Sequence, residues 1–292
     1  HRDLHSFPTR RSSDLLMSVT NIMQQIDSLP PLPQTIIELE KFKKSASTDV
    51  GELIKIIEKD PLIVSTLLKV SNSAMFGFVS KIETPSRAVN LLGINFTLSI
   101  ALASNMSKVI NPNLESYGKT SDDFLRIANM QSNFVTLWIG KIDRNLRDDL
   151  ILPAFLQESG KFLISNEIKQ QNKTAEFLEQ LNNRFDDIAG IEKEFTGVSA
   201  SEVTSAIFKH WGLNENLVND ILYSDYPNDA TLKSKEYAQI LYVTKLVCNL
   251  VKPLDEKCID KGRELIKNYG FDTKYFNDAI DKLQDRLLDE EN

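Results

Sequence analysis

Residues 29–109 read LPPLPQTIIELEKFKKSASTDVGELIKIIEKDPLIVSTLLKVSNSAMFGFVSKIETPSRAVNLLGINFTLSIALASNMSKV. Apolar residues recur within this stretch at the spacing of one helix face, in four short runs. Two runs begin with a typical helix start, Asp60-Pro61 and Thr84-Pro85. In such a pair the first side chain accepts from free helix amides, and the proline lacks an N–H that would need a partner. The stretch therefore predicts a group of short helices.

Other helix boundaries in the stretch follow from capping residues. Asp49 and Glu52 have the spacing of a capping box, which predicts a helix start at residue 49. Gly93 predicts a helix end, because glycine adopts the left-handed backbone at little cost. Asn95 is expected to cap the run 96–109, which is apolar on nearly every side and should be a buried helix.

The rest of the chain is also predicted to be helical. Ser199 and Glu202 form a second capping-box pattern, and Gly212 ends the helix that follows. No segment alternates like a β-strand, so the predicted fold class is all-α, a multi-helix bundle. After a polar linker at 111–121, helices are expected at residues 122–143, 150–168, 175–185, 188–195, 199–212, 217–223, 237–251, 258–269 and 275–288.

The order of motifs in residues 29–109 resembles that of the HDOD family, bacterial signalling-output domains related to the HD metal-dependent phosphohydrolases. A proline-rich start and a DP helix start are followed by NSAMFG at residues 72–77 and IETPSRAVNLLG at residues 82–93. The resemblance implies an HD-domain-like bundle with an N-terminal helical subdomain. It also implies a regulatory protein that binds other signalling proteins and catalyses nothing itself.

The second half lacks the metal ligands of the HD phosphohydrolases. Those enzymes hold metals with histidines and an adjacent His-Asp pair, which helps to form a nucleophilic water. The corresponding positions here carry Gln131, Gln157-Glu158 (ahead of Gly160-Lys161), Ala200 and Ser224-Asp225. Glutamine is a poor ligand and alanine offers none. We therefore predict a degenerate metal site with no catalytic residue, no metal and no other cofactor.

Two alternative functions stay open at this point. Magnesium needs only one or two carboxylates plus waters, so a phosphohydrolase with unusual ligands could use Glu158, Asp187 or Asp225. The vacated pocket could instead bind a nucleotide, lined by Lys161 and the two glutamines of the degenerate site. His210, the only histidine after residue 5, is interpreted as a structural residue at a helix end.

The predicted domain organisation has three parts. Residues 1–16 precede Met17 and lack hydrophobic periodicity, so we interpret them as a disordered leader derived from adaptor sequence. An N-terminal helical half is expected at 17–110, and an HD-like half at 122–292. The run LPPLP at 29–33 is interpreted as a rigid start to the first helices of the domain rather than a polyproline ligand.

Composition excludes several classes of partner. The net charge is −7, and no basic stripe is present, which argues against nucleic acid. No apolar run reaches the ~18 residues of a membrane helix, so no membrane association is expected. Cys248 and Cys258 lack metal-ligand spacing, and no secretory signal is apparent. The predicted location is therefore the cytoplasm, with both thiols reduced and Cys248 in the core.

Overall fold

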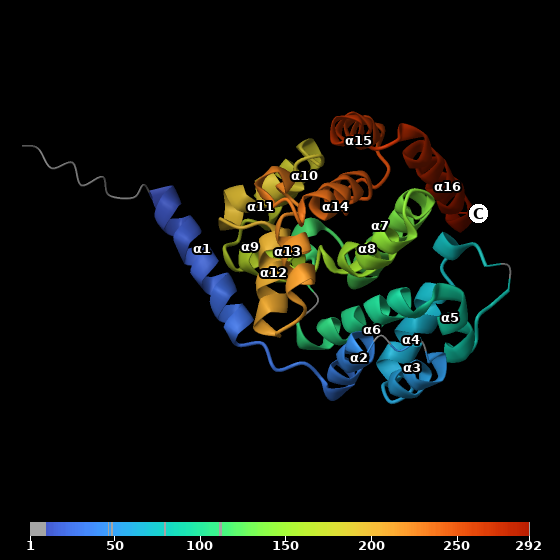
Figure 1. Ribbon diagram of the computed structural model, residues 1–292. Helices are drawn as coiled ribbons and strands as arrows, with labels where there is room; N and C mark the ends of the chain where they lie inside the picture. Colours follow the sequence, from blue (N-terminus) through green and yellow to red (C-terminus); the bar gives the residue numbers. More distant parts are fainter. Residues whose placement is uncertain (1–9, 46, 48, 79, 111–112, 292) are drawn as a thin grey trace, which may run out of the picture.

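The structure, a computed structural model, describes residues 10–45, 47, 49–78, 80–110 and 113–291. Every regular element in this part of the chain is helical (Figure 1), so the all-α prediction is confirmed. The α-helices are α1 (Arg10–Asp27), α2 (Gln34–Lys44), α3 (Val50–Ile57), α4 (Pro61–Ser71), α5 (Pro85–Leu92), α6 (Ile94–Val109), α7 (Ser121–Trp138), α8 (Arg144–Leu156), α9 (Lys161–Gln170), α10 (Thr174–Asn183), α11 (Ile188–Thr196), α12 (Ala200–His210), α13 (Glu215–Leu222), α14 (Lys235–Val247), α15 (Glu256–Tyr269) and α16 (Thr273–Glu291). Short 3₁₀ turns are η1 (Ala74–Phe76), η2 (Glu115–Tyr117), η3 (Ile139–Lys141) and η4 (Pro227–Asp229).

Most helix starts use the capping residues that the sequence indicates. The Asp60 carboxylate accepts from Leu62 N at 3.0 Å, and α4 begins at Pro61. Thr84 has the same role before Pro85 in α5. At α12 the capping box is complete in both directions, with Ser199 N donating to Glu202 Oε2 at 2.7 Å. These boundaries follow from interactions within one helical turn, which the sequence contains locally.

Two predicted caps differ in the structure. α6 begins at Ile94, because the Gly93 carbonyl already accepts the first helical hydrogen bond, from Thr97 N at 3.2 Å. Asn95 therefore lies inside the first turn and is not the cap. At α3, Asp49 accepts from Gly51 N and Glu52 N, but the Glu52 carboxylate is bound by the Ser47 hydroxyl, so that capping box is one-sided.

Two predicted segments also have different boundaries. The helix expected at 150–168 is divided into α8 and α9, because residues 157–160 turn sharply between them. The linker expected at 111–121 is only partly a surface connection. Its residues 111 and 112 lie outside the described part, whereas Ser116 and Tyr117 are buried in η2.

The first helix starts earlier than expected. Residues 10–16, predicted to be a disordered leader, form the first turns of α1. Within α1 the Ser18 hydroxyl donates to Asp14 O at 3.0 Å, and the Thr20 hydroxyl donates to Leu16 O at 2.8 Å. A helix extends readily once it is nucleated, so a packed segment after residue 16 can order the residues before it.

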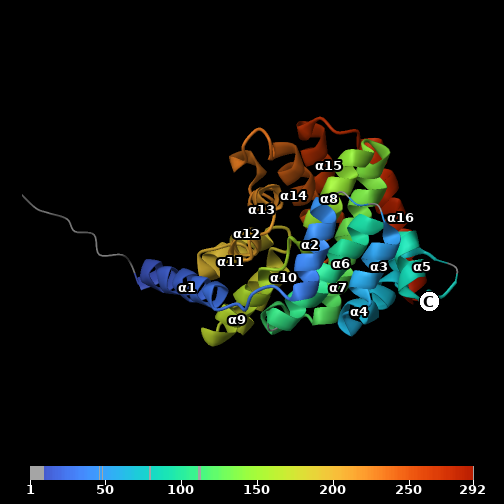
Figure 2. The same cartoon turned by 60° about the horizontal axis from the view of Figure 1, so that its bottom comes forward.

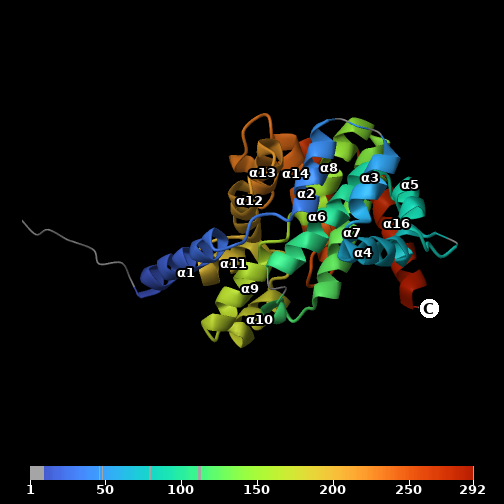
Figure 3. The same cartoon turned by 90° about the horizontal axis from the view of Figure 1, so that it is seen from below.

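The two ends of the chain each pack against helices that lie far away in sequence. α1 lies along α9, α11 and α12 of the second half (Figures 1 and 2), while α2 joins α3 and α6. α16 lies against α7 and η1, so the C-terminus returns to the side of the molecule that holds α2–α6 (Figure 3). The structure thus connects the two predicted halves at both chain ends.

The core is continuous through both halves and contains aromatic residues from each of them. Phe96 of α6 packs edge-on against Phe155 of α8, with ring centroids 5.9 Å apart. Trp138 of α7 is fully buried among Phe134 and Phe276. No helix in the described ranges combines the length and the apolar character that crossing a bilayer requires.

Candidate functional site

The positions of the predicted degenerate site come from four separate segments and lie close together. Gln131 is on α7, Gln157-Glu158 follow α8, Ala200 begins α12, and Ser224-Asp225 follow α13. All six side chains are buried. Gln157 Nε2 donates to Gln131 Oε1 at 2.8 Å, and Gln131 Nε2 donates to Cys248 O at 3.0 Å.

Gly160 allows these segments to approach each other. The Gly160 amide donates to the Thr204 hydroxyl of α12 at 2.8 Å, and that hydroxyl is also 2.7 Å from Ala200 O. A Cβ on Gly160 would lie only 2.4 Å from Ala200 O. The start of α9 and the start of α12 are therefore in direct backbone contact beside the site.

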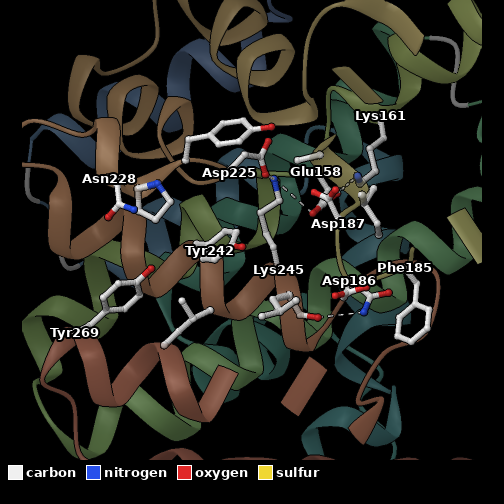
Figure 4. A pocket seen from close by; sticks show the side chains of 17 residues that line it. Glu158, Lys161, Phe185, Asp186, Asp187, Asp225, Asn228, Tyr242, Lys245 and Tyr269 are labelled. Atoms are coloured by element: carbon white, nitrogen blue, oxygen red, sulfur yellow. Dashed lines mark hydrogen bonds and ion pairs between the residues drawn. The ribbon is translucent and has the colours of Figure 1, made fainter. Parts of the chain in front are cut away.

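Two buried lysines occupy the centre of the site. Lys161 is 2% exposed and its Nζ lies 2.8 Å from Glu158 Oε2 and 2.5 Å from Glu192 Oε1. Lys245 on α14 forms an ion pair with Asp225, and its Nζ is 3.7 Å from Glu158 Oε1. Figure 4 shows these side chains pointing toward one another at the inner wall of a pocket. Three carboxylates thus share two ammonium groups.

Glu192 and Asp225 also accept hydrogen bonds from backbone amides. Glu192 Oε2 accepts from Ala200 N at 2.7 Å, and Glu192 Oε1 accepts from the Tyr117 hydroxyl at 2.8 Å. Asp225 Oδ2 accepts from Ser201 N at 3.1 Å. These hydrogen bonds fix the carboxylates in place, which a buried charge requires.

Burial and pairing act in opposite directions on the charged groups of the network. Burial disfavours the ionised form of Asp225, but Lys245 and the Ser201 side chain outweigh it and hold the pKa of that carboxyl well below its usual range. Burial lowers the pKa of Lys161, and the nearby Glu192 carboxylate opposes that change. In both groups the ion-pair partner thus opposes the effect of burial.

A cavity of about 260 Å³ lies outside this network. Its floor includes Glu158, Lys161, Asp225 and Lys245, and tyrosines 226, 242 and 269 surround it (Figure 4). The two glutamines do not line the cavity, contrary to the prediction for a nucleotide pocket. They bond to each other behind its wall, so only Lys161 of the predicted lining residues is in place.

Asp187, proposed from sequence as a magnesium ligand, lines the cavity but has a structural role. Its carboxylate accepts from Gly190 N at the start of α11 and pairs with Arg184 at 2.8 Å. Within the described ranges, no three side chains among His, Cys, Asp and Glu are placed to share a metal ion. The described side chains therefore offer no set of ligands like the histidines and the His-Asp pair that the resemblance to HD enzymes implies.

Sequence reasoning missed Lys245 and Glu192. The available signal for Lys245 was a charged residue inside an apolar run, TKLVCNL at 244–250, on a helix that is buried nearly all round. Cys248, in the same run, is buried as predicted. Nothing local marks Glu192, since its partners lie on α9, η2 and α12.

His210 lies away from this network, at the end of α12. Its Nε2 is 3.3 Å from Leu29 O, and Trp211 Nε1 donates to Pro30 O at 3.0 Å. The two residues hold the LPPLP segment between α1 and α2. That segment therefore runs along the end of α12 instead of wedging only against the first helices of the domain.

Comparison with known families assigns the fold. The model of the HDOD domain family matches residues 29–227, more than half of the chain. The chain belongs to the HDOD domain family. The family match extends across both predicted halves, and the resemblance seen in the motifs of residues 29–109 is confirmed.

Several relatives of this HDOD chain are known. An uncharacterised protein of Treponema pallidum (strain Nichols) is 20% identical over 207 residues, which is 70% of this chain and 39% of that protein. The chain thus spans about two fifths of the length of that curated relative. A virulence factor from Campylobacter jejuni subsp. jejuni has a solved structure with a TM-score of 0.55 and 26% identity, covering 92% of this chain and 97% of its own.

Two further solved structures share the HDOD fold. One is a protein from Shewanella amazonensis SB2B whose name proposes a phosphohydrolase, with a TM-score of 0.63, 20% identity and coverage of 92% and 95% of the two chains. The other, from Marinobacter aquaeolei VT8, is named for a proposed role in signal transduction, with a TM-score of 0.69, 15% identity and coverage of 94% and 63%. At these identities the likeness concerns the fold alone.

Proposed function

We propose that this HDOD chain is a non-catalytic regulatory protein of bacterial signalling that acts by binding other proteins. The observation that carries the proposal is the pair of buried ammonium groups, Lys161 and Lys245, at the centre of the degenerate site. They neutralise the carboxylates that a metal ion would otherwise use. The name of the Marinobacter protein agrees with a signalling role.

The charge balance of the site disfavours the phosphohydrolase alternative. A divalent ion among Glu158, Glu192 and Asp225 would lie next to two ammonium groups that are already paired with them. Like charges in a buried site repel strongly, and the site supplies no imidazole ligand. In the HD phosphohydrolases a bound metal ion helps to form the nucleophilic water, so a site that repels such an ion lacks that contribution.

The cavity beside the site disfavours the nucleotide alternative. Four carboxylates line it, those of Glu158, Asp186, Asp187 and Asp225, against two lysines that are engaged in ion pairs. Phosphate groups would meet net negative charge there.

We place the protein in the cytoplasm, where thiols stay reduced, in keeping with the free cysteines 248 and 258.

The proposal is tested with purified full-length chain from cells grown with added manganese and iron. We expect metal analysis to find far less than one ion per chain. With manganese supplied, we also expect hydrolysis of bis(p-nitrophenyl) phosphate to stay at background. The matched control is the double variant Glu158→Gln, Asp225→Asn, which removes both candidate ligands while keeping side-chain size. A near-stoichiometric metal together with turnover that the double variant loses would refute the proposal.

A further inference from the structure

A second, larger cavity of about 630 Å³ opens on the other side of the molecule. Residues 76–78 and 91–96 form one part of its wall, and α7, α8 and α16 form the rest. Phe76 belongs to the NSAMFG motif, and Leu91, Leu92 and Gly93 end the IETPSRAVNLLG motif. The lysine network uses neither motif. We refer to this cavity as the motif groove.

The wall of the motif groove is largely apolar and partly open to solvent. Phe76 and Phe78 stack with ring centroids 5.6 Å apart, and both are only partly buried. Leu91 is 46% exposed, and Leu92 and Leu137 line the groove beside it. Contiguous apolar surface of this kind, with a polar rim, is typical of interaction sites.

One charge in the motif groove lacks a counter-ion. Arg286 on α16 donates to Met75 O at 2.5 Å and contacts Asn133 Oδ1 at 3.5 Å. Among the side chains that the structure describes, which stop at residue 288, no carboxylate forms an ion pair with Arg286. Arg147, the other arginine in the groove, pairs with Asp148 at 2.5 Å. Half-burial of Arg286 lowers its pKa, which shows that the lost solvent is not fully replaced.

We propose that the motif groove docks a segment of a partner protein in which apolar side chains flank one carboxylate, with the carboxylate bound by Arg286. The volume is within the range of sites that bury several side chains, and an amphipathic segment in an apolar groove is a recurrent binding mode. An arginine can bind a carboxylate through two parallel hydrogen bonds, which would fix the register of the segment. This inference rests on the proposed function and specifies where the partner binds.

The test uses a phage-displayed library of short random peptides selected against the full chain. We expect the enriched peptides to carry Asp or Glu between apolar residues. A synthetic copy of the best peptide, followed by fluorescence anisotropy, should bind about tenfold more weakly to Leu91→Ser and to Arg286→Glu. A peptide with the acid changed to Lys should regain affinity for Arg286→Glu. A merely structural role of Arg286 would not produce that exchange.

Two exposed positions provide matched controls. Lys282→Glu reverses a charge one turn before Arg286, and Leu232→Ser removes a leucine that is 93% exposed elsewhere. Both should bind the peptide like the wild type. If Arg286→Glu does not fold, as judged by circular dichroism, Leu91→Ser decides alone.

Three outcomes would overturn the inference: enriched peptides without an acidic residue, no enrichment at all, or unchanged peptide affinity in Leu91→Ser. Binding of decanoate in place of any peptide would also overturn it, because the groove would then be a fatty-acid site. These results are independent of the metal and phosphodiester assays. The peptide experiments can therefore refute the groove as a binding site without refuting the non-catalytic function, and the metal and phosphodiester assays can do the reverse.

Discussion

Lys161 and Lys245 show how single residues can alter the chemistry of a site within the HDOD fold. Each is nearly inaccessible to solvent and lies among carboxylates. An ammonium group cannot act as a Lewis acid, whereas a metal ion polarises the water that it binds. Under the proposed function, these two side chains provide the positive charge at the site in place of a metal ion.

Asp220 gives a pH-dependent prediction at the same scale. Its side chain is buried on α13, and burial raises the pKa to about 6, with Asp149 adding to the effect. The protonated form is thus favoured in the folded state. The stabilisation is complete below the unfolded pKa of about 4 and is lost as the pH rises through 6. Because the adjoining cavity admits solvent, we expect the loss to be about 1 kcal/mol.

The measurement is urea unfolding of wild type and Asp220→Asn at a series of pH values between 4 and 7. The free energy of unfolding of Asp220→Asn should not show the loss of about 1 kcal/mol that we expect for the wild type as the pH rises through 6. Asp229→Asn, at an exposed position, serves as the control and should keep the wild-type slope. Equal slopes for wild type and Asp220→Asn would contradict the assignment.

Helix-to-helix contact at Gly160 gives a prediction at the scale of elements. A Cβ at this position would lie 2.4 Å from Ala200 O and 2.9 Å from Thr204 N, both backbone atoms of α12. Neither atom can move without displacing the helix. We expect Gly160→Ala to lower the free energy of unfolding by about 3 kcal/mol, the upper range for overpacking.

Gly51→Ala in α3 is the matched control, since its nearest neighbour is the flexible Asp49 carboxylate at 3.1 Å. Its stability should change by less than about 1 kcal/mol, because alanine favours the helix. Chemical denaturation of both variants provides the comparison. A similar small effect for Gly160→Ala would show that α9 and α12 are not held in contact.

Packing of both chain ends against distant helices predicts the behaviour of the whole molecule. Leu283 on α16 is fully buried, and α16 lies against α7 and η1. We expect Leu283→Ala to destabilise the protein by about 2–5 kcal/mol and to shift the entire unfolding transition. Far-UV circular dichroism and the fluorescence of Trp138 and Trp211 should report one midpoint.

Leu232→Ala is the control for this prediction, because Leu232 is 93% exposed. Its transition should stay within about 0.5 kcal/mol of the wild type. Separate midpoints for the two probes would mean that the halves unfold independently. The α1 and α16 contacts would then be too weak to couple them.

The helical fold class, the family and four helix starts could be predicted from local sequence patterns. Asp60-Pro61, Thr84-Pro85 and the Ser199–Glu202 box act within one turn, so their consequences can be read without the rest of the chain. The loss of histidines from the degenerate site was likewise visible in composition. Errors arose where a neighbouring residue took over a local role, as Gly93 did from Asn95.

The charged network around the predicted degenerate site could be seen only in three dimensions. Lys161, Glu192, Asp225 and Lys245 come from different segments, and their charges matter because they meet in a volume without solvent. Helical periodicity records which face of a helix is buried but not which distant residue lies opposite. The same reason explains why the packing of α1 on the second half and the unpaired Arg286 of the motif groove became visible only in three dimensions.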